Sequence, residues 1–546
     1  MPAATSGRKG DGVPEVVDAV VVGGGHNGLV AANRLADAGW DVVVLEAQPE
    51  VGGAVRSGEV VRPGFVTDLY SSFYPLSAAS PAIRSLRLEE HGLRWRHAPS
   101  VVAHPLRDGR AAVLSRDLDA TAASVESFAP GDGAAWREVF AEWQRIRDPL
   151  LSALFTPIPP VGGALGILRR LGAVQTLRFV RFALTPVTSY GRQQFRGEGA
   201  PLLFAGNAMH SDLSPDGAGS ALFGWLLCML GQDVGFPVPE GGSGRLVGAM
   251  VSRLERAGGQ VRTSSPVARV TMAGGRATGV VLEGGGEIRA RKAVLADVSA
   301  PMLYERLVGR EHLSPRFCRD LDSFEWDDAT LKVNWALSGP VPWKAEGCRG
   351  AGTVHVGVDM ADLTDYSADL KTGRIPQRPF MLFGQTTTAD PTRSPVGTES
   401  TWSYTHLPRR HPLDDAALDR HVERMEDTLE EYAPGFRDLV LDRGVQRPRD
   451  LQGHDASLDM GAVNAGSSNP SQLLVLRPTP GLGRPETPVE GLFLASASAH
   501  PGGGVHGAPG WNAARAALLR DSRLGSVAAK GFLAATRYLT GGLASS

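Results

Sequence analysis

The stretch DAVVVGGGHNGLVAANRLADAGWDVVVLEAQPEVGGAVR, residues 18–56, decides the fold of this chain. Its apolar run at 19–22 predicts a buried parallel strand. Gly23, Gly25 and Gly28 follow in the G-x-G-x-x-G spacing. The first glycine permits a tight turn, the second lets the backbone approach a pyrophosphate, and the third lets the next helix pack against the strand. The free N–H groups at that helix N-terminus suit an anion.

A second strand at 41–45 ends at Glu46, which lies 23 residues after Gly23. A carboxylate in this position binds ribose hydroxyls and repels a 2′-phosphate, which favours FAD or NAD over NADP. His26 and Asn27 lie between the glycines and are included among the cofactor-binding residues. The order of strand, turn, helix, strand and acid predicts a dinucleotide site, and the alternative is a glycine-rich loop in an ordinary βαβ unit.

Composition sets limits on the function. The 546 residues suffice for three or four domains, and 42% hydrophobic and 21% charged residues are typical of a globular protein. A net charge of −2 gives no reason to expect a nucleic-acid partner. The cysteines at 228, 318 and 348 are far apart and form no metal or dithiol motif, which favours a reducing, cytoplasmic setting. No apolar run reaches the roughly 18 residues of a spanning helix.

The segment after Glu46 indicates which dinucleotide is bound. Gly52 and Gly53 leave bare backbone, and Arg56 supplies a cation for phosphate. At this distance from Glu46 the sequence resembles the FAD-dependent amine oxidase and phytoene desaturase group. In that group such a segment lies against the diphosphate or ribityl chain of the flavin. The resemblance therefore favours FAD over NAD.

The C-terminal part carries a second signature. HPGGGVHGAPGWNAA at 500–514 resembles that of phytoene desaturase-like oxidoreductases at nearly every position, although Ala497 stands where the family often has glycine. Its glycines leave N–H groups beside a helix N-terminus, which predicts a second flavin contact. The candidate contacts are Gly502, Gly503, Gly504 and Val505. With the opening fingerprint and residues 341–355, the resemblance covers most of the chain and is strongest for bacterial carotenoid-dehydrogenase-like proteins.

The same resemblance assigns two further positions to the cofactor. Gly241 and Gly242 precede an amphipathic helical pattern and are implied to lie near the flavin. The residue that matches Val267 holds the adenine through its backbone in the group.

The expected architecture combines α/β and α+β parts. A Rossmann-type FAD-binding domain with a parallel sheet, discontinuous in sequence, carries an inserted substrate domain with an antiparallel sheet and helices on one side. The FAD-binding segments are expected at 17–105, 236–305 and 486–525, and the substrate or cap domain at 106–235 and 306–485. Residues 1–16 are expected to be a disordered tail, and 526–546 an amphipathic helix and tail.

Catalytic residues are less clearly marked, because the sequence shows no nucleophilic triad, paired carboxylates or metal-binding pattern. Lys332 lies in a hydrophobic strand, where a charge is costly without a partner or a role, unless it is simply exposed. In amine-oxidase-like relatives a lysine on a comparable strand holds a water at flavin N5. His506, in the expected flavin loop, and His210, a substrate contact or a helix cap, are the other candidates. Aromatic residues that line the cavity or pack the core are Tyr70, Phe73, Tyr74, Trp335, Trp402 and Tyr404.

Residues 149–190 mix large apolar residues with four arginines and contain no acid. Such a basic amphipathic segment lies in a membrane interface or forms a helical cap whose arginines face water. The first reading predicts peripheral contact with the inner face of a membrane.

These observations predict an FAD-dependent oxidoreductase that transfers hydride between flavin N5 and a hydrophobic substrate, a polyene, isoprenoid or lipid. The alternatives are a flavin-dependent amine oxidase and a flavin-containing binding or assembly protein with little turnover. The electron acceptor stays open among O2, a quinone and NAD. No pattern predicts the oligomeric state or the direction of the reaction.

Overall fold

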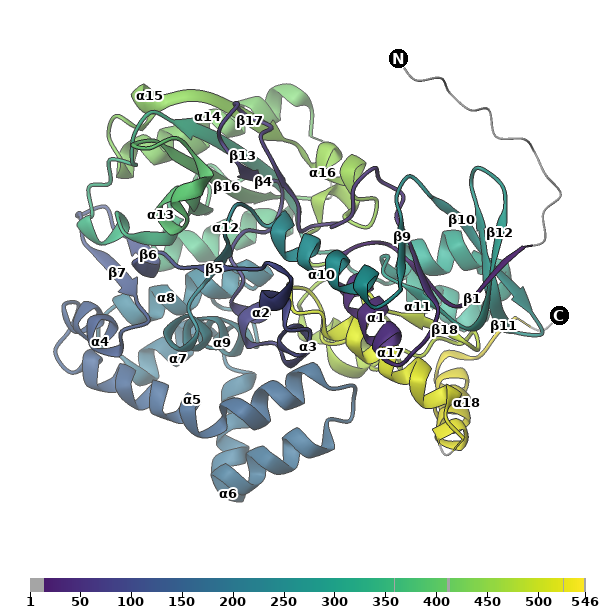
Figure 1. Cartoon of the computed structure of the whole chain (residues 1–546). Coiled ribbons are helices and arrows are strands. Elements are labelled where there is room, and N and C mark those ends of the chain that lie inside the picture. The colour runs from purple at the N-terminus through teal and green to yellow at the C-terminus, as the bar shows by residue number, and fades with distance from the viewer. Residues whose placement is uncertain (1–13, 358, 410–412, 524, 545–546) are drawn as a thin grey trace, which may run out of the picture.

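The computed structural model describes residues 14–544 apart from 358, 410–412 and 524. Two seven-stranded sheets organise these residues, one at the right and one at the upper left of Figure 1. The first sheet has the order β10-β11-β12-β1-β2-β9, and β18 also pairs with β12. Its strands are β1 (Glu15–Val22), β2 (Val42–Leu45), β9 (Gln260–Arg262), β10 (Val267–Ala273), β11 (Arg276–Leu282), β12 (Glu287–Ala296) and β18 (Leu492–Leu494).

This sheet confirms the predicted Rossmann-type fold. Strands β9, β2, β1, β12 and β18 are parallel, and they come from three separate parts of the chain. Alternate residues face opposite sides of the sheet, so both faces are apolar and both are covered. One face is covered by α1 (His26–Asp37), α10 (Gly244–Arg256) and α17 (Ala508–Asp521), and the other by η3 (Met302–Gly309) and α11 (Pro315–Asp322).

The second sheet has the order β17-β13-β16-β15-β14-β6-β7. Its strands are β6 (Ser100–Pro105), β7 (Ala111–Leu114), β13 (Ala329–Leu337), β14 (Ala351–Val356), β15 (Met381–Gln385), β16 (Glu399–Leu407) and β17 (Val440–Gln446). All neighbours are antiparallel except β14 and β6, which are parallel. The expected boundary after residue 105 is therefore misplaced by one strand, because β6 pairs with β14 and forms a hairpin with β7.

Helices cover both faces of the second sheet, not one as expected. On one face α14 (Asp415–Tyr432) packs against the apolar side of β13 and β15. On the other face α8 (Gly199–Ala208), α9 (Ser220–Asp233) and α12 (Met360–Thr372) form a core with residues of β6, β15 and β16. The helical layer extends through α4 (Leu118–Glu126), α5 (Asp132–Phe155), α6 (Val161–Ala183) and α7 (Val187–Gln194).

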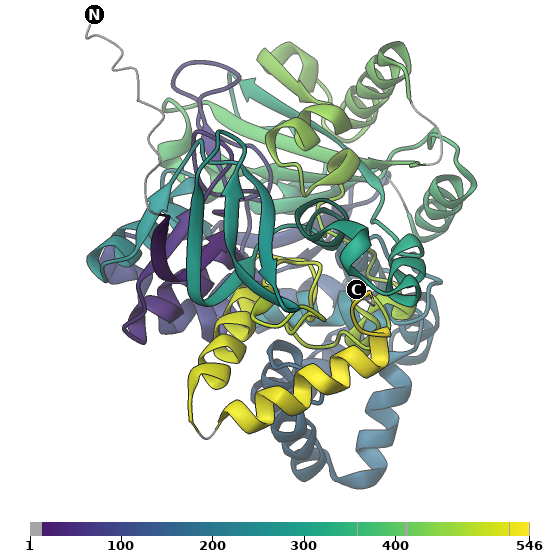
Figure 2. The ribbon, with the colours of Figure 1, turned by 90° about the vertical axis from the view of Figure 1, so that its right-hand side faces the viewer.

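Two helices lie at the lower side of the molecule. Helix α6 projects at the bottom of Figure 1, and only Gly163, Ile167 and Phe179 of it are buried. Helix α18 (Gly525–Thr540), yellow in Figure 2, is the expected C-terminal amphipathic helix. Within the described part of the chain, no helix combines the length and the apolar character needed to cross a bilayer.

The chain ends differ slightly from expectation. Strand β1 begins at Glu15, so residues 15 and 16 belong to the sheet and not to a tail. Residue 14 is described, whereas residues 1–13 of the expected tail and residues 545 and 546 lie outside the described residues. The short elements are β3 (Ser57–Gly58), β4 (Thr67–Asp68), β5 (Trp95–Arg96), β8 (Val238–Pro239), α2 (Pro75–Ala79), α3 (Pro81–Ser85), α13 (Thr386–Ala389), α15 (Phe436–Leu439) and α16 (Pro448–His454).

Candidate functional site

The two N-terminal glycine segments lie side by side. The Gly52 N–H donates to the Gly24 carbonyl at 2.9 Å, and Gly25 and Gly52 form an isolated β-bridge. Gly23 has a φ of +97°, and a Cβ there would lie 2.4 Å from the Asp297 carbonyl oxygen. The turn between β1 and α1 therefore requires glycine for both its conformation and its packing.

The C-terminal glycine segment packs onto the same turn. The Ser77 hydroxyl donates to the Val505 carbonyl at 2.5 Å, and the Ser80 hydroxyl donates to the His506 carbonyl at 2.5 Å. A Cβ on Gly510 would lie 1.8 Å from the Asn27 carbonyl oxygen, so α17 and α1 approach closely through this glycine. Segments from both ends of the chain thus meet at the carboxyl edge of the parallel strands.

A cavity of about 830 Å³ lies where these segments meet. The predicted cofactor residues that line it are Gly23, Gly25, His26, Asn27, Glu46, Gly53, Arg56, Val267, Gly503, Gly504 and Val505. The carboxyl edge of a parallel sheet is the usual place for a dinucleotide.

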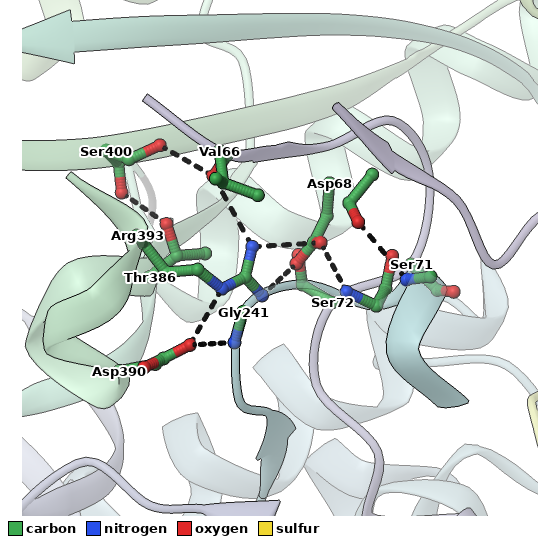
Figure 3. A network of polar contacts seen from close by, with 12 residues as sticks. Val66, Asp68, Ser71, Ser72, Gly241, Thr386, Asp390, Arg393 and Ser400 are labelled. Atoms are coloured by element: carbon green, nitrogen blue, oxygen red, sulfur yellow. Dashed lines mark hydrogen bonds and ion pairs between the residues drawn. The ribbon is translucent and has the colours of Figure 1, made fainter. Parts of the chain in front are cut away.

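Other predicted cofactor residues lie behind the cavity wall. The Gly28 N–H donates to Asp297 Oδ2 at 2.7 Å, and a Cβ on Gly502 would contact the Arg477 side chain. The Gly241 N–H donates to Asp390 Oδ2 at 2.7 Å, as Figure 3 shows. A Cβ on Gly242 would lie 2.3 Å from Ser57 Oγ. Along with Gly52, these glycines support the wall, and their direct contact with the cofactor stays a prediction.

Two backbone N–H groups hold the Glu46 carboxylate in place. Its Oε2 accepts the Gly24 N–H at 2.8 Å, and its Oε1 accepts the Gln48 N–H at 2.8 Å. Each carboxylate oxygen can accept more than one hydrogen bond, so both Glu46 oxygens keep a lone pair to which a ribose hydroxyl could donate.

Several buried polar atoms at the cavity wall lack protein partners. They are His26 Nε2, Asn27 Oδ1, Arg56 Nε and Asn464 Nδ2. Buried polar atoms are nearly always hydrogen-bonded in folded proteins, so their pairing by a bound molecule is expected. Together with the α1 N-terminus, Arg56 and Glu46, they fit a flavin dinucleotide whose diphosphate lies at α1 and whose ribose lies at Glu46.

Lys332 faces the other end of the cavity from β13. It is 2% exposed, so the alternative of an exposed lysine is wrong. Its ammonium donates to the carbonyls of Asp68 and Tyr70 and lies 5.2 Å from the centre of the Trp402 ring. Burial lowers the pKa of Lys332 to about 7, against the opposing influence of Asp68.

A buried ion pair involves Asp68, whose carbonyl accepts the Lys332 ammonium; Figure 3 shows the pair. Arg393 donates to both carboxylate oxygens of Asp68, at 3.0 and 2.8 Å, and its Nε donates to Asp390 at 3.1 Å. Both side chains of the Asp68–Arg393 pair are 0% exposed. Burial opposes ionisation of Asp68, but Arg393 outweighs it and holds the pKa of this carboxyl below its usual value.

Aromatic residues form one wall of the substrate end. Trp402 and Tyr404 stack with their planes 10° apart, and both line the cavity, as do Tyr70, Phe73 and Tyr74. Trp335 does not line it and packs in the core, which is one of the two readings that the sequence left open for this residue. Because side chains alternate along β13, Trp335 points to the opposite face from Lys332 and packs in the core covered by α14.

The two candidate histidines differ in their surroundings. His210 lines the cavity, and its Nε2 lies 3.0 Å from Nε2 of His355. His506 also lines it, but its Nδ1 accepts the Ala508 N–H at 3.1 Å and its Nε2 lies 3.3 Å from the Gly503 carbonyl. Desolvation lowers the pKa of His210 to about 4 and that of His506 to about 3. Both are neutral at neutral pH, and their catalytic roles stay predictions.

Sequence reasoning missed Asp297, Asp455 and Asn464, which also line the cavity. Asp297 directly follows β12, so the rule that ligands bind beyond the carboxyl ends of parallel strands would have indicated it. Asp455 and Asn464 lie in an irregular segment after α16, where no periodic pattern marks a residue.

Comparisons with known proteins agree with this geometry. The family profile described as flavin containing amine oxidoreductase matches residues 28–518. The chain is 30% identical to pyridine nucleotide-disulfide oxidoreductase domain-containing protein 2 of Rattus norvegicus, over 93% of this chain and 94% of that protein. It is 26% identical to the zeta-carotene-forming phytoene desaturase of Myxococcus xanthus, over 92% of each chain.

The solved structures show the same fold. Cyclohexylamine oxidase from Brevibacterium oxydans superposes with a TM-score of 0.56 at 16% identity, over 92% of this chain and 98% of that one. The family supplies the flavin, and the adenosine-binding arrangement around Glu46 identifies it as FAD. This chain therefore belongs to the flavin containing amine oxidoreductase family and is an FAD-dependent oxidoreductase.

Proposed function

We propose that this enzyme dehydrogenates an apolar substrate of the isoprenoid or lipid class. The observation that supports this most is the group of apolar side chains that line the cavity. Its residues come from α5, α9 and the segment after α16, and they are Leu154, Phe155, Leu222, Phe223, Leu226, Leu227, Leu473 and Leu474. Such a lining binds a long hydrocarbon by burial of apolar surface and offers few partners to a polar one.

The cavity opens to the surface beside α6. Leu184 and Leu474 line it and are also 60% and 57% exposed, so they lie where the cavity meets the surface. A substrate that enters there would reach the glycine segments at the far end. The similarity to a phytoene desaturase over nearly the whole chain supports the same substrate class.

The protein's part in the reaction is to bind and orient the substrate and to exclude water from it. FAD supplies a two-electron acceptor that takes hydride at N5. Trp402 and Tyr404 would hold the substrate against one face of the cavity, and the apolar lining would exclude water from it. Lys332, with a pKa of about 7, would take or hold a proton near neutral pH. His210 is a second proton-accepting candidate, because its neutral ring faces the cavity.

The alternative of an amine substrate has one observation in its favour. The stacked Trp402–Tyr404 pair, with ring centres 6.0 Å apart, resembles a flat wall that would orient a small neutral amine. Its fold-level support is the likeness to cyclohexylamine oxidase. We favour the apolar substrate because many of the side chains that line the cavity are leucine and phenylalanine.

We also propose that α6 contacts the surface of an anionic phospholipid bilayer. Its exposed apolar residues are Val161, Leu165, Leu168, Val174, Leu177, Val180 and Leu184. Arg169, Arg170, Arg178 and Arg181 are exposed on the same helix and match anionic headgroups in charge. Because the cavity opens beside the C-terminal end of α6, docking would let a lipid-soluble substrate enter directly from the bilayer. The three cysteines are free thiols, which fits the cytoplasmic face of that membrane.

Anaerobic reduction of the bound flavin tests the substrate class. The holoenzyme is mixed without oxygen with phytoene or limonene in liposomes, and separately with cyclohexylamine in buffer, while flavin absorbance is followed. Bleaching by an isoprenoid and not by the amine supports the proposal. Bleaching by the amine alone, followed by peroxide release in air, would contradict it and support the oxidase. Loss of isoprenoid-driven bleaching in Lys332→Met, with unchanged flavin content, would support the role of this lysine.

A further inference from the structure

Carboxyl groups surround the expected diphosphate position. Asp297 lies at the N-terminus of α1, where its Oδ2 accepts the Gly28 N–H at 2.7 Å. A Cβ on Gly25 would lie 2.6 Å from the same oxygen. The Asp297 carboxyl is therefore in contact with the backbone that an incoming diphosphate would approach.

Asp455 also lies next to the glycine pair. Its Oδ2 lies 3.2 Å from the position of a Cβ on Gly53, and its Oδ1 accepts the Ser457 N–H at 2.9 Å. Because Gly53 lies against Gly25, both carboxyls border the paired glycine segments. Asp455 comes from the segment after α16, so residues from distant parts of the chain converge here.

If these carboxyl groups are ionised, their negative charges repel the negatively charged diphosphate. Glu46 adds a third carboxyl to the same end of the cavity, and Arg56 is the cation beside it. Arg56 is already paired with Glu50 at 2.9 Å, so it offsets the negative charge only in part. A diphosphate placed among these groups would raise the proton affinity of every carboxyl near it.

The surroundings already favour the protonated forms. Desolvation, with the charges of Asp455 and Glu46, raises the pKa of Asp297 to about 8 against the opposing Gly28 N–H. Desolvation also raises the pKa of Asp455 to about 6, and the Glu46 charge adds to this. A protonated carboxyl carries an O–H that donates a hydrogen bond, which a carboxylate does not.

We propose that Asp297 and Asp455 bind the FAD diphosphate as neutral carboxylic acids that donate hydrogen bonds, so that cofactor binding takes up protons. The inference rests on the assignment of FAD to this cavity. It adds two cofactor-binding residues that neither the sequence motifs nor the family resemblance indicates. It also makes cofactor affinity a function of pH.

Other titratable groups around the cavity do not account for such an effect. The pKa of His26 is lowered to about 4 by desolvation, so His26 is neutral throughout the neutral range. Glu283, Arg306 and His454 line the cavity but are exposed. The oxygens of Glu46 accept the N–H groups of Gly24 and Gln48. Lys332 also has a pKa of about 7, but its ammonium contacts Asp68, Tyr70 and Trp402 and not the glycine segments. The two aspartates are therefore the groups beside the glycine segments that are in position to change protonation.

The pH dependence of FAD affinity tests the inference without any substrate. Apoprotein is titrated with FAD, and the dissociation constant is measured from flavin fluorescence between about pH 6 and about pH 9. Each unit by which the diphosphate raises a carboxyl pKa weakens binding about tenfold over the window in which that group loses its proton. We therefore expect the dissociation constant to rise at least tenfold across this range.

Proton uptake provides a direct second readout. FAD is added to apoprotein in a weakly buffered solution with a pH-indicator dye, and the protons taken up per bound flavin are counted. ADP, which carries the diphosphate without the flavin, is expected to cause the same uptake, and riboflavin, which lacks it, none. A flat affinity profile with no uptake on FAD binding would overturn the inference and leave the cofactor assignment intact. Failure to bind FAD at any pH would overturn both.

Asp297→Asn and Asp455→Asn identify the groups responsible. An amide has the shape of a neutral carboxyl, still accepts a backbone N–H and donates hydrogen bonds without taking up a proton. Each variant is expected to bind FAD well at low pH, with a flatter pH profile and less proton uptake. Glu255→Gln, an exposed carboxyl on α10 away from the cavity, is the matched control and should keep the wild-type profile. Wild-type slopes in both aspartate variants would refute the proposal.

Discussion

Replacement of Arg393 by methionine tests how the second sheet is joined to the cofactor domain. Arg393 follows α13, whereas Asp68 belongs to β4, and the pair is fully buried. Removal of one partner from a buried ion pair costs about 3–5 kcal/mol, because the remaining charge has no counter-ion. Asp68 keeps hydrogen bonds from Ser72 and the Ser243 N–H, so we expect a value near the lower limit, about 3 kcal/mol.

The assay is chemical denaturation of the holoenzyme, followed by circular dichroism and by flavin fluorescence. Arg393→Lys keeps the charge but loses the two-pronged geometry, so it should recover only part of the loss. The double variant Asp68→Asn, Arg393→Met removes one of the two carboxylates that lose their cation, the other being Asp390, and should be more stable than Arg393→Met alone. A loss below about 1 kcal/mol in Arg393→Met, the range of an exposed ion pair, would refute the reasoning.

Three further predictions follow from single positions. In the wild type, the free energy of unfolding should rise between about pH 7 and about pH 10, because the unfolded chain binds one more proton at Lys332 than the folded chain in that window, and Lys332→Met should lose this rise. Thermal unfolding at several pH values checks this, and a pH profile equal to that of the wild type contradicts it. Gly510→Ala should destabilise the protein by about 1–3 kcal/mol and weaken FAD binding, because the added Cβ would overlap the Asn27 carbonyl oxygen. Retention of flavin on dialysis equal to that of the wild type would contradict this. Leu184→Glu should change the free energy of unfolding by less than about 0.5 kcal/mol yet reduce flotation of the protein with anionic liposomes. Val396→Glu, an exposed control far from α6, should leave flotation unchanged. Equal flotation of both variants would contradict membrane docking through α6.

The cofactor half of the fold was largely predictable from the sequence. The strand at 19–22, the glycine turn and Glu46 follow one another within a single βαβ unit, so local periodicity and spacing determine them. The apolar patterns at 331–339, 351–358, 379–387 and 400–408 predict β13, β14, β15 and β16 of the second sheet, whereas β17, with the mixed sequence VLDRGVQ, carries no such pattern. The position of β6 was not predictable, because its pairing with β14 joins residues about 250 positions apart, for instance Val102 with Thr353.

The site was predictable in part. Motif spacing identifies several of the glycines that line the cavity. Gly241 and Gly242 show, however, that a glycine pattern does not distinguish residues that line a cavity from residues that lie behind its wall. The sequence left Trp335 open between cavity wall and core, because a nine-residue strand has two faces and only tertiary packing determines which one meets the cavity. The Asp68–Arg393 pair joins residues 325 positions apart and carries no local signal.

The most direct test of the account is the identity and amount of flavin bound by the purified protein. The protein is reconstituted with an equimolar mixture of FAD and FMN, freed of excess flavin and denatured, and the released flavin is identified by chromatography. The account predicts one FAD per chain and no FMN, and a large loss of FAD in Gly25→Val, whose side chain would occupy the space of the Asp297 carboxyl. Absence of bound flavin, retention of FMN, or undiminished FAD in Gly25→Val would contradict the proposed cavity.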